Sequence, residues 1–179
     1  MRARTLVLGL GNVLLGDEGI GVWVAEALRR GFEFPEWVSV LEGGTLGLDL
    51  LPRLDGVERL LLIDAVRTGR APGDVVRLEG DEVPAALDLK VSPHQIGVQD
   101  LLAAAWLMGR EPPSVVLWGI EPERLEPGTG FSPRVAEALP RLQAEVLDEL
   151  GRWGAPGAPA AAAPPPPIWW EAAEPARAR

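Results

Sequence analysis

Apolar positions along this chain fall into two kinds of run, one typical of buried strands and one typical of helices. Residues 5–10 and 59–64 are strongly apolar, which predicts strands buried on both faces of a parallel sheet. Shorter apolar runs at 38–41 and 115–119 predict two further strands. Residues 74–79 follow a glycine-bounded turn at 69–73, so we expect them to pair back as an edge strand.

Helical periodicity fills the segments between these strands. It predicts helices over 18–30, 47–54 and 95–108, and a last helix with Ser132 as its N-cap and Pro133 as its first residue. The stripe of the 95–108 helix is Val98, Leu101, Leu102, Ala105 and Met108. Strands that alternate with helices predict an α/β fold, a three-layer α/β/α arrangement around a mostly parallel central sheet.

The composition changes sharply at Gly154. From there to Pro167 the chain is almost entirely Ala, Pro and Gly, followed by Ile168-Trp169-Trp170 and a short charged tip. Such a stretch lacks the apolar side chains that build a core and favours extended conformers. We therefore expect one folded domain over 1–153 and a disordered tail over 154–179.

Charge and cysteine content exclude several classes of protein. The chain has 17 Lys and Arg against 26 Asp and Glu, a net charge of -9. This balance argues against binding to nucleic acid or to an anionic membrane. The absence of cysteine excludes disulfides, thiolate metal sites and a cysteine nucleophile. No run of about 20 apolar residues and no signal-peptide pattern is present, so we expect a cytoplasmic protein.

Three candidate chemical groups lie where predicted elements begin or end. They are Glu18, Asp64 and His94, the only histidine. Sites in open α/β sheets lie beyond the carboxyl ends of the strands, where Glu18 and Asp64 are expected. Each residue alone also has a structural explanation: Asp64 can cap a loop, Glu18 can complement a helix dipole, and His94 can cap a helix. Their joint occurrence favours a carboxylate–imidazole site.

A nucleotide-binding turn is a second interpretation of the first loop. Gly9-Leu10-Gly11 begins like a dinucleotide motif, with Glu42 as a possible ribose acceptor. Leu14 occupies the position of the third glycine, and two carboxylates, Asp17 and Glu18, would then lie close to the pyrophosphate. The charges therefore disfavour this interpretation.

Five ordered segments between residues 1 and 150 resemble the hydrogenase maturation endopeptidases, the nickel-dependent proteases that trim the large subunit of [NiFe]-hydrogenases. They are Leu8-Gly9-Leu10-Gly11-Asn12-Val13-Leu14-Leu15-Gly16-Asp17-Glu18-Gly19-Ile20-Gly21, Gly43-Gly44-Thr45-Leu46-Gly47, Leu62-Ile63-Asp64-Ala65-Val66, His94-Gln95-Ile96-Gly97-Val98-Gln99-Asp100, and Gly119-Ile120-Glu121-Pro122 with Phe131-Ser132-Pro133. The tail after Gly154 lies outside the resemblance, and it and Pro93 differ from the pattern expected of the family.

The resemblance implies a phosphorylase/hydrolase-like α/β domain with Glu18, Asp64 and His94 as catalytic residues and nickel ligands. It implies that the nickel is supplied by the substrate, a hydrogenase large-subunit precursor with a C-terminal extension. The residues expected to contact substrate are Asp17, Gly43, Gly44, Thr45 and Gln95. The reaction expected is metal-assisted hydrolysis, with Asp17, Glu18 and Asp64 as candidate bases. A non-enzymatic factor that binds the nickel-loaded subunit is the alternative, because it would use the same ligands.

Overall fold

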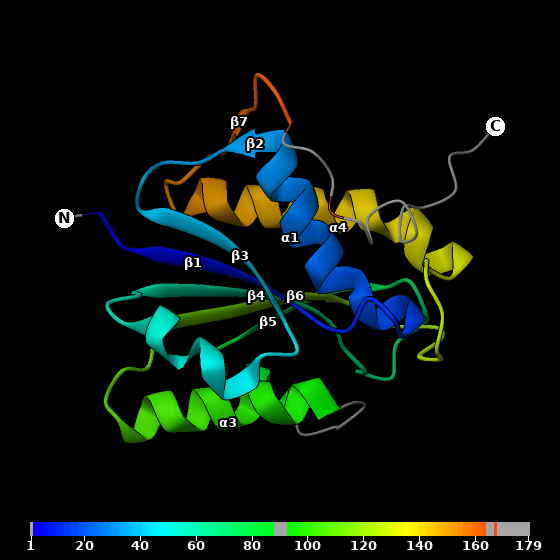
Figure 1. Ribbon diagram of the computed structural model, residues 1–179, viewed down its shortest axis with the longest axis horizontal. Coiled ribbons are helices and arrows are strands. Elements are labelled where there is room, and N and C mark those ends of the chain that lie inside the picture. The colour runs from blue at the N-terminus through cyan, green and yellow to red at the C-terminus, as the bar shows by residue number, and fades with distance from the viewer. Residues whose placement is uncertain (1, 88–92, 164–166, 168–179) are drawn as a thin grey trace.

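A five-stranded sheet forms the middle layer of the protein (Figure 1). The structure, a computed structural model, describes residues 2–87, 93–163 and 167, without the side chains of 93–96. The strands are β1 (Thr5–Leu10), β3 (Val38–Gly44), β4 (Arg59–Ala65), β5 (Val75–Glu79) and β6 (Ser114–Ile120). Their order is β3-β1-β4-β6-β5, with β5 antiparallel to β6 and every other neighbouring pair parallel.

Helices cover both faces of this sheet, which confirms the predicted three-layer α/β/α fold (Figure 1). Helices α1 (Ile20–Gly31) and α4 (Pro133–Arg152) pack on one face. The other face is covered by η2 (Gly47–Leu54), α2 (Glu82–Leu87) and α3 (Pro93–Leu107). The predicted parallel strands and the antiparallel edge strand are all present.

The central strands are buried along their whole length. Every residue of β1 is buried, as is every residue of β4 after Arg59. Their side chains alternate between two apolar clusters, so Leu6 and Leu8 face α3 while Val7 faces α1. This two-sided burial explains why neither strand shows the polar alternation of a half-exposed strand.

Several details differ from the sequence-based expectation. The helix predicted over 18–30 is divided into a short 3-10 helix, η1 (Gly16–Gly19), and α1. Met108 was expected on the buried stripe of α3, but the helix ends at Leu107 and Met108 is half exposed. The prediction was wrong there because a residue beyond the helix end no longer follows the helical stripe. Helix α2 was not predicted.

The predicted tail begins with residues that pack on the domain. Ala155 is buried and donates a backbone bond to Leu150. Strand β7 (Ala158–Pro159) pairs with β2 (Phe32–Glu33), and the amide of Ala160 bonds the carbonyl of Gly31. The boundary at 153/154 stays a prediction, and Trp169 and Trp170 lie outside the described residues. No helix within the described ranges has the length and apolar character to cross a bilayer.

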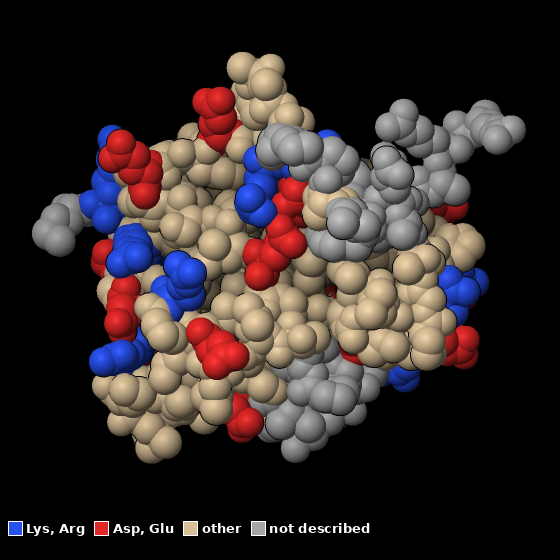
Figure 2. Space-filling model, viewed as in Figure 1, with Lys and Arg blue, Asp and Glu red and all other residues tan. Residues whose placement is uncertain are grey.

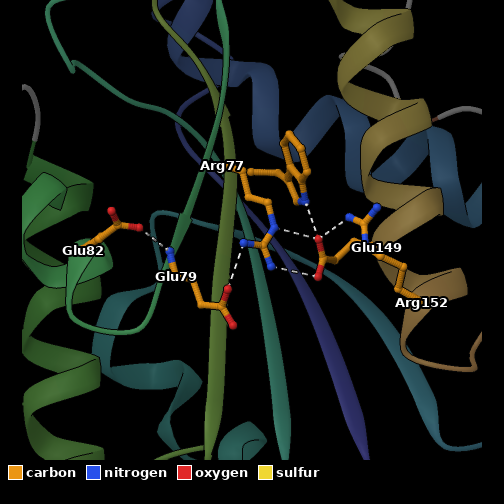
Figure 3. Close-up of polar contacts among 6 residues, drawn as sticks. Arg77, Glu79, Glu82, Glu149 and Arg152 are labelled. Atoms are coloured by element: carbon orange, nitrogen blue, oxygen red, sulfur yellow. Dashed lines mark hydrogen bonds and ion pairs between the residues drawn. The ribbon is translucent and has the colours of Figure 1, made fainter.

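A buried carboxylate fixes α4 to the antiparallel edge of the sheet (Figure 3). Glu149 on α4 accepts two bonds from Arg77 on β5, at 2.8 and 3.1 Å, and one from the indole of Trp118 on β6, at 3.2 Å. Arg152 also bonds Glu149, and Arg77 bonds the exposed Glu79. Because Arg77 lies on β5 and bonds Glu149 on α4, it joins the edge strand to the last helix.

Candidate active site

The two candidate carboxylates lie at the carboxyl edge of neighbouring strands. Glu18 belongs to η1, which follows β1, and Asp64 is the penultimate residue of β4. Because Gly9 pairs with Ile63, Asp64 lies level with the end of β1. Both residues are buried, at 3% and 0% exposure, and Asp64 accepts a 2.8 Å bond from the amide of Ala65. A parallel sheet thus brings both carboxylates to one edge, as the sequence predicted.

Glycines allow the backbone around Glu18 to approach the strand ends. Gly11 has a φ of +117°, and a Cβ built there would lie 1.8 Å from the carbonyl oxygen of Glu18. A Cβ on Gly21 would lie 2.0 Å from the carbonyl oxygen of Ile63. Both distances are impossible for real atoms, so only glycine permits this packing. The glycine motif of the first loop therefore serves close packing of η1 and α1 on the sheet.

The same packing bears on the nucleotide interpretation. The space beside Gly11, where a pyrophosphate would approach the backbone, is filled by the backbone of Glu18. Glu42, the candidate ribose acceptor, is ion-paired with Arg29 at 2.8 Å. Gly11 and Glu42 thus contact Glu18 and Arg29, in the places where the nucleotide interpretation needs a pyrophosphate and a ribose.

The first turns of α3 lie beside the loop that follows β3. A Cβ on Gly47 would be 3.0 Å from the Cα of Gly97, so the two backbones are in direct contact. Gly43 is buried, Gly44 is half-buried and Thr45 is exposed at this edge. His94 and Gln95 belong to the first turn of α3, and their side chains lie outside the described residues. The chain segment that carries His94 is therefore held at the carboxyl edge of the sheet.

Asp17 has a role that the sequence did not reveal. Its carboxylate is fully buried and accepts four bonds: from the amide of Ser132 at 2.7 Å, the hydroxyl of Ser132 at 2.9 Å, and the amides of Glu123 and Arg124 at 3.0 and 2.8 Å. Ser132 is the N-cap residue of α4 and Pro133 its first residue, as predicted, but the hydroxyl of Ser132 bonds Asp17 and no amide of the helix. Asp17 thus attaches the 121–132 loop to the turn that carries Glu18.

Glu121 performs a similar task one loop further along the edge. Its Oε2 atom accepts bonds from the amide and hydroxyl of Thr68, at 2.7 and 2.9 Å, and from the amide of Arg70 at 3.2 Å. The residue is 6% exposed. Glu121 lies in one of the five family segments, but the sequence pattern indicated no role for it. Most of the hydrogen bonds that Asp17 and Glu121 accept come from backbone amides. The two carboxylates therefore fix two loops without an Arg or Lys side chain as partner in these bonds.

A complete three-ligand cluster does not appear among the side chains that the structure describes. The imidazole of His94 is outside that set, so the ligand set stays a prediction. Carboxylates at one edge, beside a helix that carries one imidazole, are the donor types that nickel accepts.

Comparison with known proteins identifies the family. The family model for hydrogenase maturation proteases matches residues 22–149. The chain belongs to the hydrogenase maturation protease family. The hydrogenase 2 maturation protease of Escherichia coli is 40% identical over 157 residues, covering 87% of this chain and 96% of that protein. HupD of Rhodobacter capsulatus is 44% identical over 153 residues, covering 84% and 73%.

Solved structures agree with the family assignment. The hydrogenase maturating endopeptidase HybD from E. coli superposes with a TM-score of 0.83 and 41% identity, covering 89% of this chain and 98% of that one. The maturation protease HybD of Thermococcus kodakarensis gives a TM-score of 0.66 and 29% identity, covering 84% and 99%. The resemblance found in the five sequence segments is thereby confirmed, and the chain shares the α/β fold of the hydrogenase maturation proteases.

Proposed function

We propose that this protein removes the C-terminal extension of a nickel-loaded [NiFe]-hydrogenase large-subunit precursor, and that the substrate brings the nickel. The observation that carries this proposal is the pair of buried carboxylates, Glu18 and Asp64, at one edge of the sheet in a maturation protease. The chain has no cysteine and one histidine. A carboxylate–imidazole site for a substrate-borne metal fits this inventory better than a thiol or serine nucleophile does.

In the proposed reaction, Glu18, Asp64 and His94 hold the substrate's metal centre at the carboxyl edge. A bound metal ion polarises a carbonyl and acidifies water. Gly43, Gly44 and Thr45 lie at the same edge, where they can contact the backbone of the substrate. Gln95, in the first turn of α3, is proposed to contact it as well.

The proton acceptor is then a carboxylate that faces the substrate. Asp17 is poorly suited, because both of its oxygens already accept hydrogen bonds from the loop at 121–132. Glu18 and Asp64 remain as candidates. We assign Asp17 the task of holding the turn of Glu18 in place.

The deciding experiment is the intact mass of a large-subunit precursor after incubation with the protein, with and without nickel in the precursor. Loss of a C-terminal peptide only from the nickel-loaded form is expected. Glu18→Gln, Asp64→Asn and His94→Ala should each abolish this loss while keeping the wild-type circular dichroism spectrum. Asp49→Asn, which alters an exposed acid on η2, is the matched control and should cleave normally.

Two results would contradict the proposal. Full cleavage by any one of the three site variants would remove that residue from the mechanism. An unchanged precursor mass, with the two proteins still bound to each other, would indicate the non-enzymatic factor that inspects the large subunit.

A further inference from the structure

The outermost strand of the sheet next to β1, β3, has an accessible backbone. Strand β3 is the outermost strand on that side, since it pairs only with β1. Ser39 is exposed, and the other residues of β3 except Gly43 are half-buried, whereas every residue of β1 is buried. β3 therefore presents one side of its backbone to the surroundings along the strand.

The register shows which groups face outward. The amide of Thr5 bonds the carbonyl of Trp37 at 2.8 Å, while Thr5 pairs with Val38. In a parallel ladder, alternate residues then bond β1, namely Trp37 just before β3 and Ser39, Leu41 and Gly43 within it. Val40 and Glu42 must then direct both their N–H and C=O groups away from β1. Within the described part of the chain, the N–H and C=O groups of Val40 and Glu42 have no backbone hydrogen-bond partner.

Different groups lie beside the two ends of β3. At its carboxyl end, Gly44 accepts a bond from the amide of Gly11, close to the turn that holds Glu18. Beside its other half lies a small hollow of about 70 Å³ whose lining includes Arg4, Arg53 and Ser39. Figure 2 shows basic side chains, among acidic ones, at the left of the molecule where the strands begin. Strand β3 thus runs from a hollow that contains Arg53 to the site of the buried carboxylates.

We propose that the C-terminal extension of the substrate binds as an added antiparallel strand on β3. This rests on the proposed function. With the substrate's metal at Glu18 and Asp64, the extension leaves the site and runs back along β3, so that it pairs with Glu42 first and Val40 next. Its terminal carboxylate then approaches the hollow beside Ser39, where Arg53 lies. Pairing through main-chain groups is a known mode of peptide recognition.

The length of β3 and the side chains near its start determine the length and the end group of the peptide that can bind. From Glu42 back to Val38 is four residues, about 14 Å of strand. The bound peptide is therefore an extended segment of at least about five residues that ends in a free carboxylate. Its residues opposite Val40 and Glu42 must keep their N–H groups, so proline is excluded at those positions.

A pair of variants at one position tests the added strand. Val40→Pro removes one outward N–H, whereas Val40→Thr keeps it with nearly the same shape. In cleavage of the nickel-loaded precursor we expect KM to rise about tenfold for Val40→Pro relative to Val40→Thr, the factor for one hydrogen bond of about 1.4 kcal/mol. The value of kcat should match in the two. Equal KM values in the two folded variants would overturn the inference.

A second measurement needs no variant. Amide resonances of the wild-type protein are followed by NMR while a synthetic peptide of the removed extension is added to millimolar concentration. We expect the amides of Val40 and Glu42 to shift more than those of Leu41 and Gly43. Shifts elsewhere, no shifts, or shifts that follow protein concentration, which would mean pairing with a second copy, would contradict the inference. Cleavage by the wild-type protein tests the proposed function separately.

Discussion

Replacing Glu149 with glutamine should lower the free energy of unfolding at pH 7 by about 3 kcal/mol. Burial alone would raise the pKa of this carboxyl, but the bonds from Arg77, Arg152 and Trp118 outweigh it and lower the pKa from 4.5 to about 2. At about 1.4 kcal/mol per unit of pKa, this difference corresponds to about 3 kcal/mol of stability above pH 5. Glutamine keeps the shape but removes the charge that the cluster stabilises.

The sign of the pH dependence follows from the lowered pKa. Because the folded protein binds the proton of Glu149 more weakly than the unfolded chain does, the stabilisation is complete above about pH 5 and is lost as the pH falls toward 2. The difference in free energy of unfolding between the wild type and Glu149→Gln should therefore become smaller as the pH falls from 5 toward 2. Urea unfolding at pH 7, 5 and 3.5, followed by tryptophan fluorescence, measures it.

The matched control uses the same arginine. Glu79 also bonds Arg77 at 2.8 Å, but its side chain is 57% exposed. Glu79→Gln should cost less than about 1 kcal/mol, since exposed ion pairs contribute little. Equal losses in the two variants, or a gap for Glu149→Gln that does not depend on pH, would refute the reasoning.

Three further perturbations test other parts of the structure. Asp17→Asn should abolish cleavage and lower the free energy of unfolding, measured in urea, by about 2 kcal/mol. The NH2 group of the new asparagine is a donor and cannot accept the hydrogen bonds from the backbone N–H groups of the loop. Burial, then a hydrogen bond and repulsion from Glu42, raises the pKa of Glu26 to about 7. Since ionising such a group costs stability as pH rises, Glu26→Gln should raise the thermal midpoint at pH 8 but not at pH 5. A chain that ends after Gly154 should have a lower midpoint than one that ends after residue 163, because Ala155 and the β2–β7 pair are lost.

The sequence predicted the layers of this fold because the central strands are buried on both sides. An unbroken apolar run such as β1 has few alternatives to a buried parallel strand, and the helices between the strands then fix the topology. The positions of Glu18 and Asp64 at one edge followed from the same rule. Strands of two residues, such as β2 and β7, carry too little pattern to be found this way.

The role of Asp17 could not be found from the sequence, because its partners lie 106 to 115 residues further along the chain. Local rules correctly placed Ser132 at the N-cap of α4, but its hydroxyl bonds the distant Asp17 and not an amide of the helix. An acid in the first turn of a helix is usually explained by the dipole alone. Only the folded arrangement of the 121–132 loop distinguishes the two explanations.

The bonds that Asp17 accepts also link motions of distant segments. The amides of Glu123, Arg124 and Ser132 share one carboxylate, so hydrogen exchange at any of them requires that carboxylate to be released. The rate at which these three amides exchange with deuterium therefore reports how often the 121–132 loop separates from Asp17, next to Glu18.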